Sequence, residues 1–440
     1  MPVLSLATAP RRIIVAWALY DWAAQPFFTV VLTFIFGPYF QNFVAPDPAT
    51  GQAWWGYGTA AAGIIVALTG PGFGAAVDRL RQPVVWLVFS MVLMSLGLSV
   101  TWFALPGAST LAPIILGGIV LAGAGAEYGI IITNAMMPGL VAKRDLGKLS
   151  GFGWAMGYVG GLALLCLVLF AFVFPQEPAF GLDKESHAPD RIVGPLSILW
   201  LWAFSLPLLK VAPRLRAPKP PRDAVTLTGI LKAWRSHKNV IRFLLSRMLY
   251  YDGVTAVFVF GGLYAAGTLG WQAQQLGVFG IILIVAGAIG TALAGRLEDV
   301  FGSKRTISVT LFGIIFAVLG IVSIEPKRIL FVIPVEPHIF GSGFASASAQ
   351  AMLGFGLIIG LFLGPVQSAS RALMARISPP DQMTTFFGLY AFTGRATAFL
   401  APLSVAIVTD LSGSRRVGIS VVIVLMVAGF MLLRGVKEQP

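Results

Sequence analysis

The stretch Ile13–Phe43, IIVAWALYDWAAQPFFTVVLTFIFGPYFQNF, is apolar and long enough to cross a bilayer, yet it carries a charge at Asp21. An aspartate near the centre of a membrane helix costs roughly 2.5 to 3.5 kcal/mol on insertion scales. Asp21 lies nine residues after Arg12, about 13 Å along a helix. A helix–helix hydrogen bond would explain the residue, but we favour a functional role because Tyr20–Asp21 recurs as Tyr251–Asp252. Pro26, about one turn after Asp21, lacks a backbone donor, so we expect a kink there.

The composition of the whole chain excludes a soluble globular protein. Of its 440 residues, 57% are hydrophobic and 11% are charged, whereas soluble domains carry about 25% charged residues. The single cysteine, Cys166, excludes an intramolecular disulfide and a thiolate metal cluster, and the three histidines fall in connecting segments. We therefore expect a polytopic membrane protein with no metal site and no cofactor.

Apolar windows of about 20 residues or more predict twelve membrane-spanning segments. Their approximate limits are 13–43, 54–77, 83–105, 110–141, 148–175, 192–211, 239–267, 272–297, 305–324, 346–375, 382–409 and 416–434. The fold class is thus an all-α membrane protein.

Lysine and arginine predict the orientation of these segments in the membrane. With a cytoplasmic N-terminus, the termini and the 2–3, 4–5, 6–7, 8–9 and 10–11 loops hold 22 of the 31 basic residues, and the opposite loops hold 6. We therefore predict that both termini are cytoplasmic. As a separate expectation, the protein lies in a bacterial inner membrane. The net charge of +13 follows from this topology, so no nucleic-acid partner is expected.

Internal repeats divide the chain into two related halves. Three pairs of motifs recur in the same order, at spacings of 231, 221 and 237 residues: Tyr20–Asp21 with Tyr251–Asp252, Gly74 and Asp78 with Gly295 and Asp299, and Gly151 and Gly157 with Gly388 and Gly394. We predict six-helix bundles at 1–211 and 239–440, joined by a basic, proline-rich cytoplasmic linker at 212–238. Proline makes the start of this linker extended, and its second part could form a surface helix or remain solvated.

The second of these repeats resembles a motif of the major facilitator superfamily, Gly-x-x-x-Asp-Arg-x-Gly followed by basic residues, in the loops between helices two and three and helices eight and nine. The resemblance implies twelve helices in two pseudo-symmetric bundles. It also implies a cytoplasmic gate whose glycines allow close helix approach and whose charges pair in one conformation. The gate residues are Gly74, Asp78 and Arg79 in the first copy and Gly295, Asp299, Gly302, Lys304 and Arg305 in the second.

A narrower resemblance lies in WALYDWAAQPFFTVVLTFIFGPYF, NAMMPGL, LSGFGWAMGYVGG and FFGLYAFTGRATAFLAP. These segments are similar to the branch related to the autophagy-associated vacuolar amino-acid effluxers and their bacterial relatives. Ala24–Gln25 stands where that branch usually has Asn-Ser. The resemblance implies efflux of amino acids.

Six ionisable residues inside the predicted spans are candidates for solute binding or proton coupling. They are Asp21, Glu127, Asp252, Arg247, Arg371 and Arg395. We rank Asp21, Glu127 and Arg395 first, then Asp252 and Arg371. Arg247 and Arg371 could instead reach the membrane interface. Tyr20 flanks Asp21, and Asn134 occupies the position equivalent to Arg371, where helix capping is an equal alternative.

The glycines of the fifth span, GFGWAMGYVGG, follow no nucleotide-binding pattern, and we predict close helix packing there instead. The chain has no phosphate-binding loop and no catalytic constellation within a span, so we expect a transporter rather than an enzyme.

These features predict secondary active transport of a small solute by alternating access, with the lipid bilayer as the other partner and a monomer as the working unit. For an amino acid, Asp21 or Glu127 would meet the ammonium group and Arg395 the carboxylate, with Asp21 and Arg395 sharing one site. One of the two acids would carry the coupling proton. Export of drugs, sugars or organic anions stays open, as does lipid handling on the same fold.

Overall fold

The computed structural model describes residues 9–211, 236–325, 327–336, 343–398 and 400–438; the side chains of 258–260, 263, 273 and 415 are also outside the description. Most of the predicted linker, 212–235, therefore lies outside the described residues. Within the described part, ten helices are long and apolar enough to cross a membrane, and Leu400–Ser412 is a shorter apolar helix. Each of the twelve predicted spans coincides with one helix or with consecutive helical segments. The predicted all-α membrane fold is confirmed.

Two compact units make up the chain. Unit 1 comprises 1–143, 156–233 and 378–395, and unit 2 comprises 144–155, 234–377 and 396–440.

The helices of unit 1 follow the chain from its N-terminus. They are α1 (Arg11–Pro26), η1 (Phe27–Phe34), α2 (Phe36–Tyr39), η2 (Phe40–Val44), α3 (Pro48–Leu80), α4 (Pro83–Ser99), η3 (Val100–Phe103), η4 (Ser109–Leu111), α5 (Ala112–Met136), η5 (Met137–Gly139), η7 (Leu169–Val173), η8 (Ala179–Gly181), α7 (Ala188–Arg191), α8 (Val193–Val211), η11 (Pro380–Gln382) and α14 (Met383–Thr393). The helix α6 (Leu146–Val168) begins in unit 2 and continues in unit 1.

The remaining elements belong to unit 2. They are η6 (Lys143–Asp145), whose first residue is in unit 1, α10 (Lys238–Leu269), α11 (Ala273–Phe301), α12 (Ser303–Val322), β1 (Arg328–Ile329), β2 (Ile333–Pro334), α13 (Ala347–Ile377), α15 (Leu400–Ser412) and α16 (Arg415–Arg434). The short strands β1 and β2 form an antiparallel pair that pairs Ile329 with Ile333. The sequence did not predict this hairpin.

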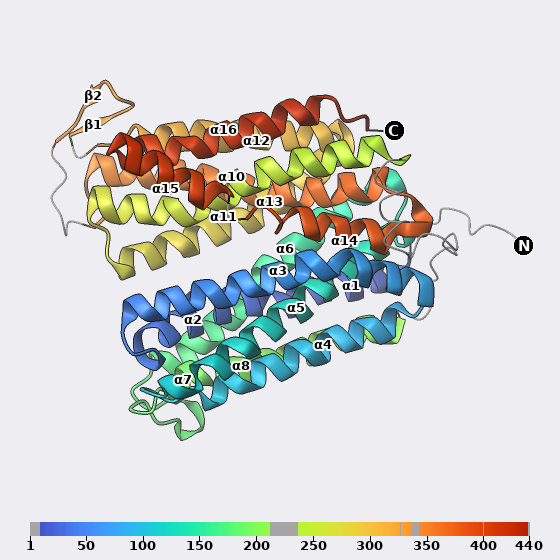
Figure 1. Cartoon of the computed structure of the whole chain (residues 1–440), viewed down its shortest axis with the longest axis horizontal. Coiled ribbons are helices and arrows are strands. Elements are labelled where there is room, and N and C mark those ends of the chain that lie inside the picture. Colours follow the sequence, from blue (N-terminus) through green and yellow to red (C-terminus); the bar gives the residue numbers. More distant parts are fainter. Residues whose placement is uncertain (1–8, 212–235, 326, 337–342, 399, 439–440) are drawn as a thin grey trace, which may run out of the picture. The chain divides into compact units, whose positions relative to one another are not determined.

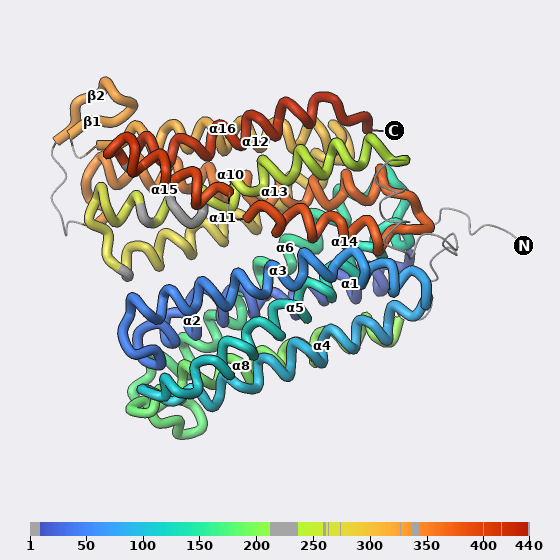
Figure 2. The backbone as a smooth tube through the Cα atoms, viewed as in Figure 1, coloured from blue at the N-terminus to red at the C-terminus, as the bar shows by residue number. Residues whose placement is uncertain are grey.

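Equivalent helices pack in equivalent pairs inside each unit. In unit 1, α1 packs on α8, and α3 and α4 both pack on α5. In unit 2, α10 packs on α16, and α11 and α12 both pack on α13. Figure 1 shows α10, α12 and α16 running alongside one another, and Figure 2 shows the same for α4, α5 and α8. The division into halves at 1–211 and 239–440 stays a prediction.

The first span is not one regular helix. The α-helical hydrogen bonding of α1 ends at Pro26, and the chain continues as the π-helix η1. Because proline cannot donate the backbone hydrogen bond that a regular helix requires, an interruption at this residue is expected. The hydrogen-bonding pattern therefore changes at Pro26, where the sequence predicts a kink.

The glycines of the fifth span allow close approach of α1. A Cβ atom added to Gly160 would overlap the backbone oxygen of Trp22, and one added to Gly161 would lie 2.5 Å from Oγ1 of Thr29. Backbone atoms cannot move aside as the end of a long side chain can, so only glycine fits at Gly160. The prediction that these glycines serve helix packing is confirmed.

The eleventh span is broken, which the sequence did not predict. The helix α14 ends at Thr393 and α15 begins at Leu400, with Gly394–Ala398 in turns. The backbone N–H of Arg395 donates to the carbonyl of Phe392 at 3.0 Å. The guanidinium of Arg395 therefore projects from a helix end rather than from a continuous helix.

Candidate functional site

An ion pair joins Glu127 of α5 to Arg395, which follows α14 in the same unit. The Nη2 group of Arg395 donates to Oε1 of Glu127. The Arg395 side chain is 36% exposed and that of Glu127 is 17% exposed. The pair is therefore only partly buried, unlike a fully buried structural ion pair.

This ion pair lines a cavity of about 60 Å³. Aromatic and aliphatic side chains form most of its wall. The lining residues are Phe27, Phe28, Leu32, Thr59, Ala62, Gly63, Ile119, Gly123, Glu127 and Arg395. A drug-sized ligand needs about 300 to 1,000 Å³. The cavity in this conformation holds only a small group, and a solute would have to separate the two charges to enter.

A larger cavity of about 510 Å³ lies between α3, α4 and α5, but its wall is almost entirely apolar. Its polar side chains, Thr69 and Tyr128, hydrogen bond to each other at 2.5 Å, and Tyr128 stacks on Phe73. Since these polar groups already satisfy each other, the smaller charged cavity is the better candidate for a polar solute.

Arg395 forms an ion pair with Glu127. Glu127 is one of the two acids that we predicted, from the sequence, to bind an ammonium group. Asp21 is half-buried on α1, and its Cβ lies 3.7 Å from where a Cβ on Gly157 of α6 would be. Tyr20 is buried, and its hydroxyl occupies the space beside Gly129 of α5. The shared site of Asp21 and Arg395 stays a prediction.

Arg371 of α13 is buried and bound to the first turns of α6. Its Nε donates to Oγ of Ser150 at 2.9 Å and its Nη2 donates to the Ser150 carbonyl at 2.7 Å. Its guanidinium also lies 5.8 Å from the ring of Trp154. The side chain thus bonds α13 to α6 in this conformation.

Two further candidates are buried polar side chains. Asp252 of α10 is 3% exposed, and its Oδ2 atom has no hydrogen-bond partner among the described residues. Asn134 is buried near the end of α5, where its carbonyl accepts from the N–H of Met137. Their place in solute binding or proton coupling stays a prediction.

The first copy of the gate motif joins α3 to the start of α14 inside unit 1. Asp78 is buried, and its carboxylate accepts from the backbone N–H groups of Thr384 at 3.2 Å and Thr385 at 2.7 Å. These N–H groups lie in the first turn of a helix, where they lack helical partners and favour a negative charge. A Cβ on Gly74 would overlap the carbonyl of Thr384. Arg79 is exposed.

The second copy repeats this arrangement between α11 and the start of α6 inside unit 2. Asp299 accepts from the N–H groups of Gly147 at 2.9 Å and Lys148 at 3.0 Å. A Cβ on Gly295 would lie 3.0 Å from the Gly147 carbonyl. In both copies, therefore, the glycine allows close approach of a second helix, and the aspartate caps the N-terminus of that helix.

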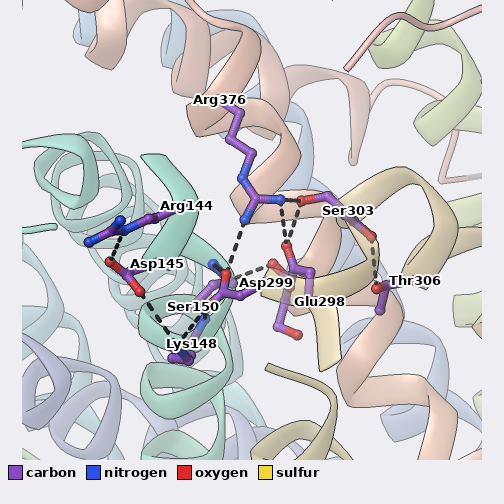
Figure 3. Close-up of polar contacts among 12 residues, drawn as sticks. Arg144, Asp145, Lys148, Ser150, Glu298, Asp299, Ser303, Thr306 and Arg376 are labelled. Atoms are coloured by element: carbon purple, nitrogen blue, oxygen red, sulfur yellow. Dashed lines mark hydrogen bonds and ion pairs between the residues drawn. The ribbon is translucent and has the colours of Figure 1, made fainter. Parts of the chain in front are cut away.

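Arg376 adds an ionic cluster to the second copy (Figure 3). Its guanidinium contacts Asp299 at 3.1 Å, Glu298 at 3.5 Å and Glu438 at 2.9 Å. Sequence reasoning missed the contacts of Arg376, Glu298 and Glu438 at this motif. The adjacent acids Glu298 and Asp299 were a signal, but nothing in the motif points to a residue 139 positions later.

Comparison with solved structures shows which proteins share this fold. FucP in the outward conformation superposes with a TM-score of 0.72 at 12% identity, covering 98% of this chain and 99% of that one. A bacterial homologue of the iron transporter ferroportin gives a TM-score of 0.69 at 17% identity, covering 96% and 98%. Together with the family match and the relatives given below, this fold makes the chain a transporter of the major facilitator superfamily. The relatives and neighbours are transporters, and the chain is not an enzyme.

Sequence comparison shows the family within this superfamily. Residues 57–439 match the sequence model of the family described as "Vacuole effluxer Atg22 like". The chain belongs to this Atg22-like family. The MFS-type transporter YxiO of Bacillus subtilis is 22% identical over 432 residues, covering 96% of this chain and 94% of that protein. Autophagy-related protein 22 of Cryptococcus neoformans is 27% identical over 306 residues, covering 66% and 50%. This chain therefore spans about half the length of that autophagy-related relative.

Proposed function

We propose that this transporter exports amino acids, binding each one as a zwitterion between Glu127 and Arg395. The observation that carries the proposal is the pairing of these opposite charges at the wall of one cavity. The ammonium group of the solute takes the place of the guanidinium beside Glu127, and its carboxylate takes the place of Glu127 beside Arg395. Binding thus exchanges one pair of charge-assisted hydrogen bonds for two.

The lining of the cavity supports a solute with a small apolar side chain. Phe27, Phe28 and Ile119 face the same space as the charges, and Gly63 and Gly123 leave room beside them. A Cβ on Gly63 would make ordinary contact, at 3.6 Å, with Cδ of Arg395. We therefore expect Gly63→Ala to narrow the site without disturbing the fold.

Alternating access follows from the ion pair as well. Without solute, the attraction between Glu127 and Arg395 holds α5 and the end of α14 together. A solute that supplies its own two charges removes this attraction and releases the segments, so occupancy changes the conformational equilibrium. A proton on Glu127 would weaken the same pair, which is how transport becomes coupled to pH.

The proposed orientation places both termini in the cytoplasm. Its support is the concentration of 22 of the 31 basic residues on that side. In a bacterium, export would then proceed from the face that holds the gate motifs to the face that holds the β1–β2 hairpin.

Reconstituted proteoliposomes test the proposal with a panel of radiolabelled amino acids and with labelled sugars as the alternative solutes. We expect counterflow of at least one small apolar amino acid, and loss of it in both Glu127→Gln and Arg395→Gln. Glu325→Gln is the matched control, because Glu325 pairs with Arg416 away from the cavity. Counterflow of sugars alone, or full amino-acid counterflow in the two cavity variants, would refute the proposal.

A further inference from the structure

The segment Gly435–Glu438, which follows α16, is bound to three other helices of unit 2; we call it the strap. Arg242 of α10 donates to the Gly435 carbonyl at 2.7 Å. Asn239 of α10 bonds both backbone groups of Lys437, donating to its carbonyl at 2.7 Å and accepting from its N–H at 2.8 Å. The strap thus has defined partners along its length.

The start of α12 holds the end of the strap. The Glu438 carboxylate accepts from the backbone N–H groups of Ser303 at 2.8 Å and Lys304 at 2.9 Å. These N–H groups belong to the first turn of a helix and favour an anion. The Lys304 ammonium donates to the carbonyls of Arg434 at 2.7 Å and Val436 at 2.8 Å. Gly302 has a φ of 87°, and a Cβ there would lie 3.0 Å from Oε2 of Glu438.

Arg376 connects the strap to the gate. Its Nη1 contacts Glu438 at 2.9 Å, while its Nη2 contacts Asp299 at 3.1 Å (Figure 3). Asp299 in turn caps the start of α6 through Gly147 and Lys148. One guanidinium therefore orients toward two carboxylates, of which one belongs to the strap and the other to the gate.

A third carboxylate competes for Arg376. Glu298 is 0% exposed and lies 3.5 Å from Nη1, and its Oε2 has no hydrogen-bond partner among the described residues. Its Oε1 accepts from Oγ of Ser303 at 2.5 Å. The other cations nearby are Lys148, at 3.8 Å from Asp299, and Lys304, whose ammonium contacts backbone carbonyls. A buried carboxylate with an unsatisfied oxygen attracts any donor that becomes available.

We propose that the strap is an intramolecular lock on the gate, in which Glu438 is a positioning residue that keeps Arg376 directed toward Asp299. When Glu438 is neutralised or the strap detaches, Arg376 turns to Glu298. Asp299 then holds the start of α6 less firmly, and α6 separates from α11 more often. The lock concerns the conformational equilibrium alone and holds for any solute.

A cysteine at Thr291 of α11 reports this separation. Thr291 is buried, and its carbonyl lies 2.9 Å from where a Cβ on Gly151 of α6 would be. In a Cys166→Ser background, Thr291→Cys is exposed to a membrane-permeant maleimide only when α6 moves away. We expect Glu438→Gln to raise the labelling rate about tenfold, equivalent to about 1.4 kcal/mol in the opening equilibrium. We expect Asn239→Ala, which removes both bonds to Lys437, to raise it as well.

Two matched controls separate the lock from general loosening. Glu177→Gln makes the same chemical change at an exposed loop residue, and Asn42→Ala removes an exposed asparagine that donates to the Pro38 carbonyl. Both should label at the parental rate. Parental or slower labelling in Glu438→Gln and Asn239→Ala, with normal labelling after denaturation, would overturn the proposal. Equal acceleration in all four variants would overturn it too. Because labelling needs no solute, the result is independent of the amino-acid assay.

Discussion

The ion pair between Glu127 and Arg395 makes a quantitative prediction for a double-mutant cycle. The changes are Glu127→Gln, Arg395→Gln and the two together, each measured by unfolding of the detergent-solubilised protein. Hydrogen bonds to charged groups contribute about 1.5 to 3 kcal/mol, whereas exposed ion pairs contribute about 0.2 to 1 kcal/mol. With Arg395 36% exposed and Glu127 17% exposed, we expect a coupling energy of about 1 to 2 kcal/mol, between these limits.

Two reference cycles show whether the coupling is specific. Glu325 and Arg416 form a pair with side chains 39% and 32% exposed, and we expect a coupling below about 0.5 kcal/mol for it. The cycle of Asp21→Asn with Arg395→Gln tests the alternative that the sequence suggested. If Asp21 were the true partner of Arg395, its coupling would exceed that of Glu127.

The same cycle with solute distinguishes a binding site from a structural bridge. An amino acid that supplies its own charges replaces the pair, so the coupling between Glu127 and Arg395 should fall when solute saturates the protein. A coupling within about 0.3 kcal/mol of zero without solute would refute the pair itself. A coupling that solute leaves unchanged would show that the pair is structural and that the solute binds elsewhere.

Further predictions concern packing, orientation and capping. Gly74→Ala should cost about 1 to 3 kcal/mol in unfolding measurements, because its Cβ would overlap the Thr384 carbonyl, whereas Gly72→Ala on the same helix, with nothing within 4 Å, should be neutral or stabilising. A cysteine replacing exposed Asp183 should react with impermeant maleimide from outside the cell; reaction only from the cytoplasm would reverse the proposed orientation. The hydroxyl of Thr50, and after it the N–H of Thr50, hydrogen bond to Asp47 and lower the pKa of its carboxyl group. The stability from this helix cap is therefore present above about pH 4 and is lost as the pH falls through the lowered pKa. Asp47→Asn should remove this acid sensitivity in thermal melts between pH 7 and pH 3, and an unchanged pH profile would contradict the assignment.

The length of the apolar runs and the repeated motifs were sufficient to predict the all-α membrane fold. A span must be about 20 apolar residues long to cross the bilayer, and few other structures tolerate such a sequence. The interruption at Pro26 was also predictable, because proline removes a specific hydrogen bond. The break at Gly394–Ala398 was not, since neither glycine nor the apolar residues around it exclude a helix.

The candidate site was predictable as a set of residues but not as a set of partners. Glu127 and Arg395 were both identified because a charged side chain within an apolar membrane span is costly in free energy and is usually kept for a function. Sequence reasoning placed Asp21 and Arg395 in one site, whereas the structure pairs Arg395 with Glu127. The sequence could not decide this pairing, because it depends on where a helix ends and in which direction its side chains project. The break after α14 decides that direction. The contact of Arg376 with Glu438 could not be predicted from the sequence either, because 62 residues separate the two partners.

The gate motif is repeated in the two halves of the chain, whereas the proposed solute site is not. Asp78 and Asp299 stand 221 residues apart, and each caps a helix that its own motif glycine admits. The charged pair has no such repetition. By the spacing of 237 residues that relates Asn134 to Arg371, Glu127 corresponds to Gly364 and Arg395 corresponds to Tyr158. A gate must work equally in both halves for alternating access, whereas a zwitterion has two different ends and requires an asymmetric site. The absence of a charged residue at the positions equivalent to Glu127 and Arg395 is therefore consistent with an asymmetric solute site in a protein whose gate motif is repeated.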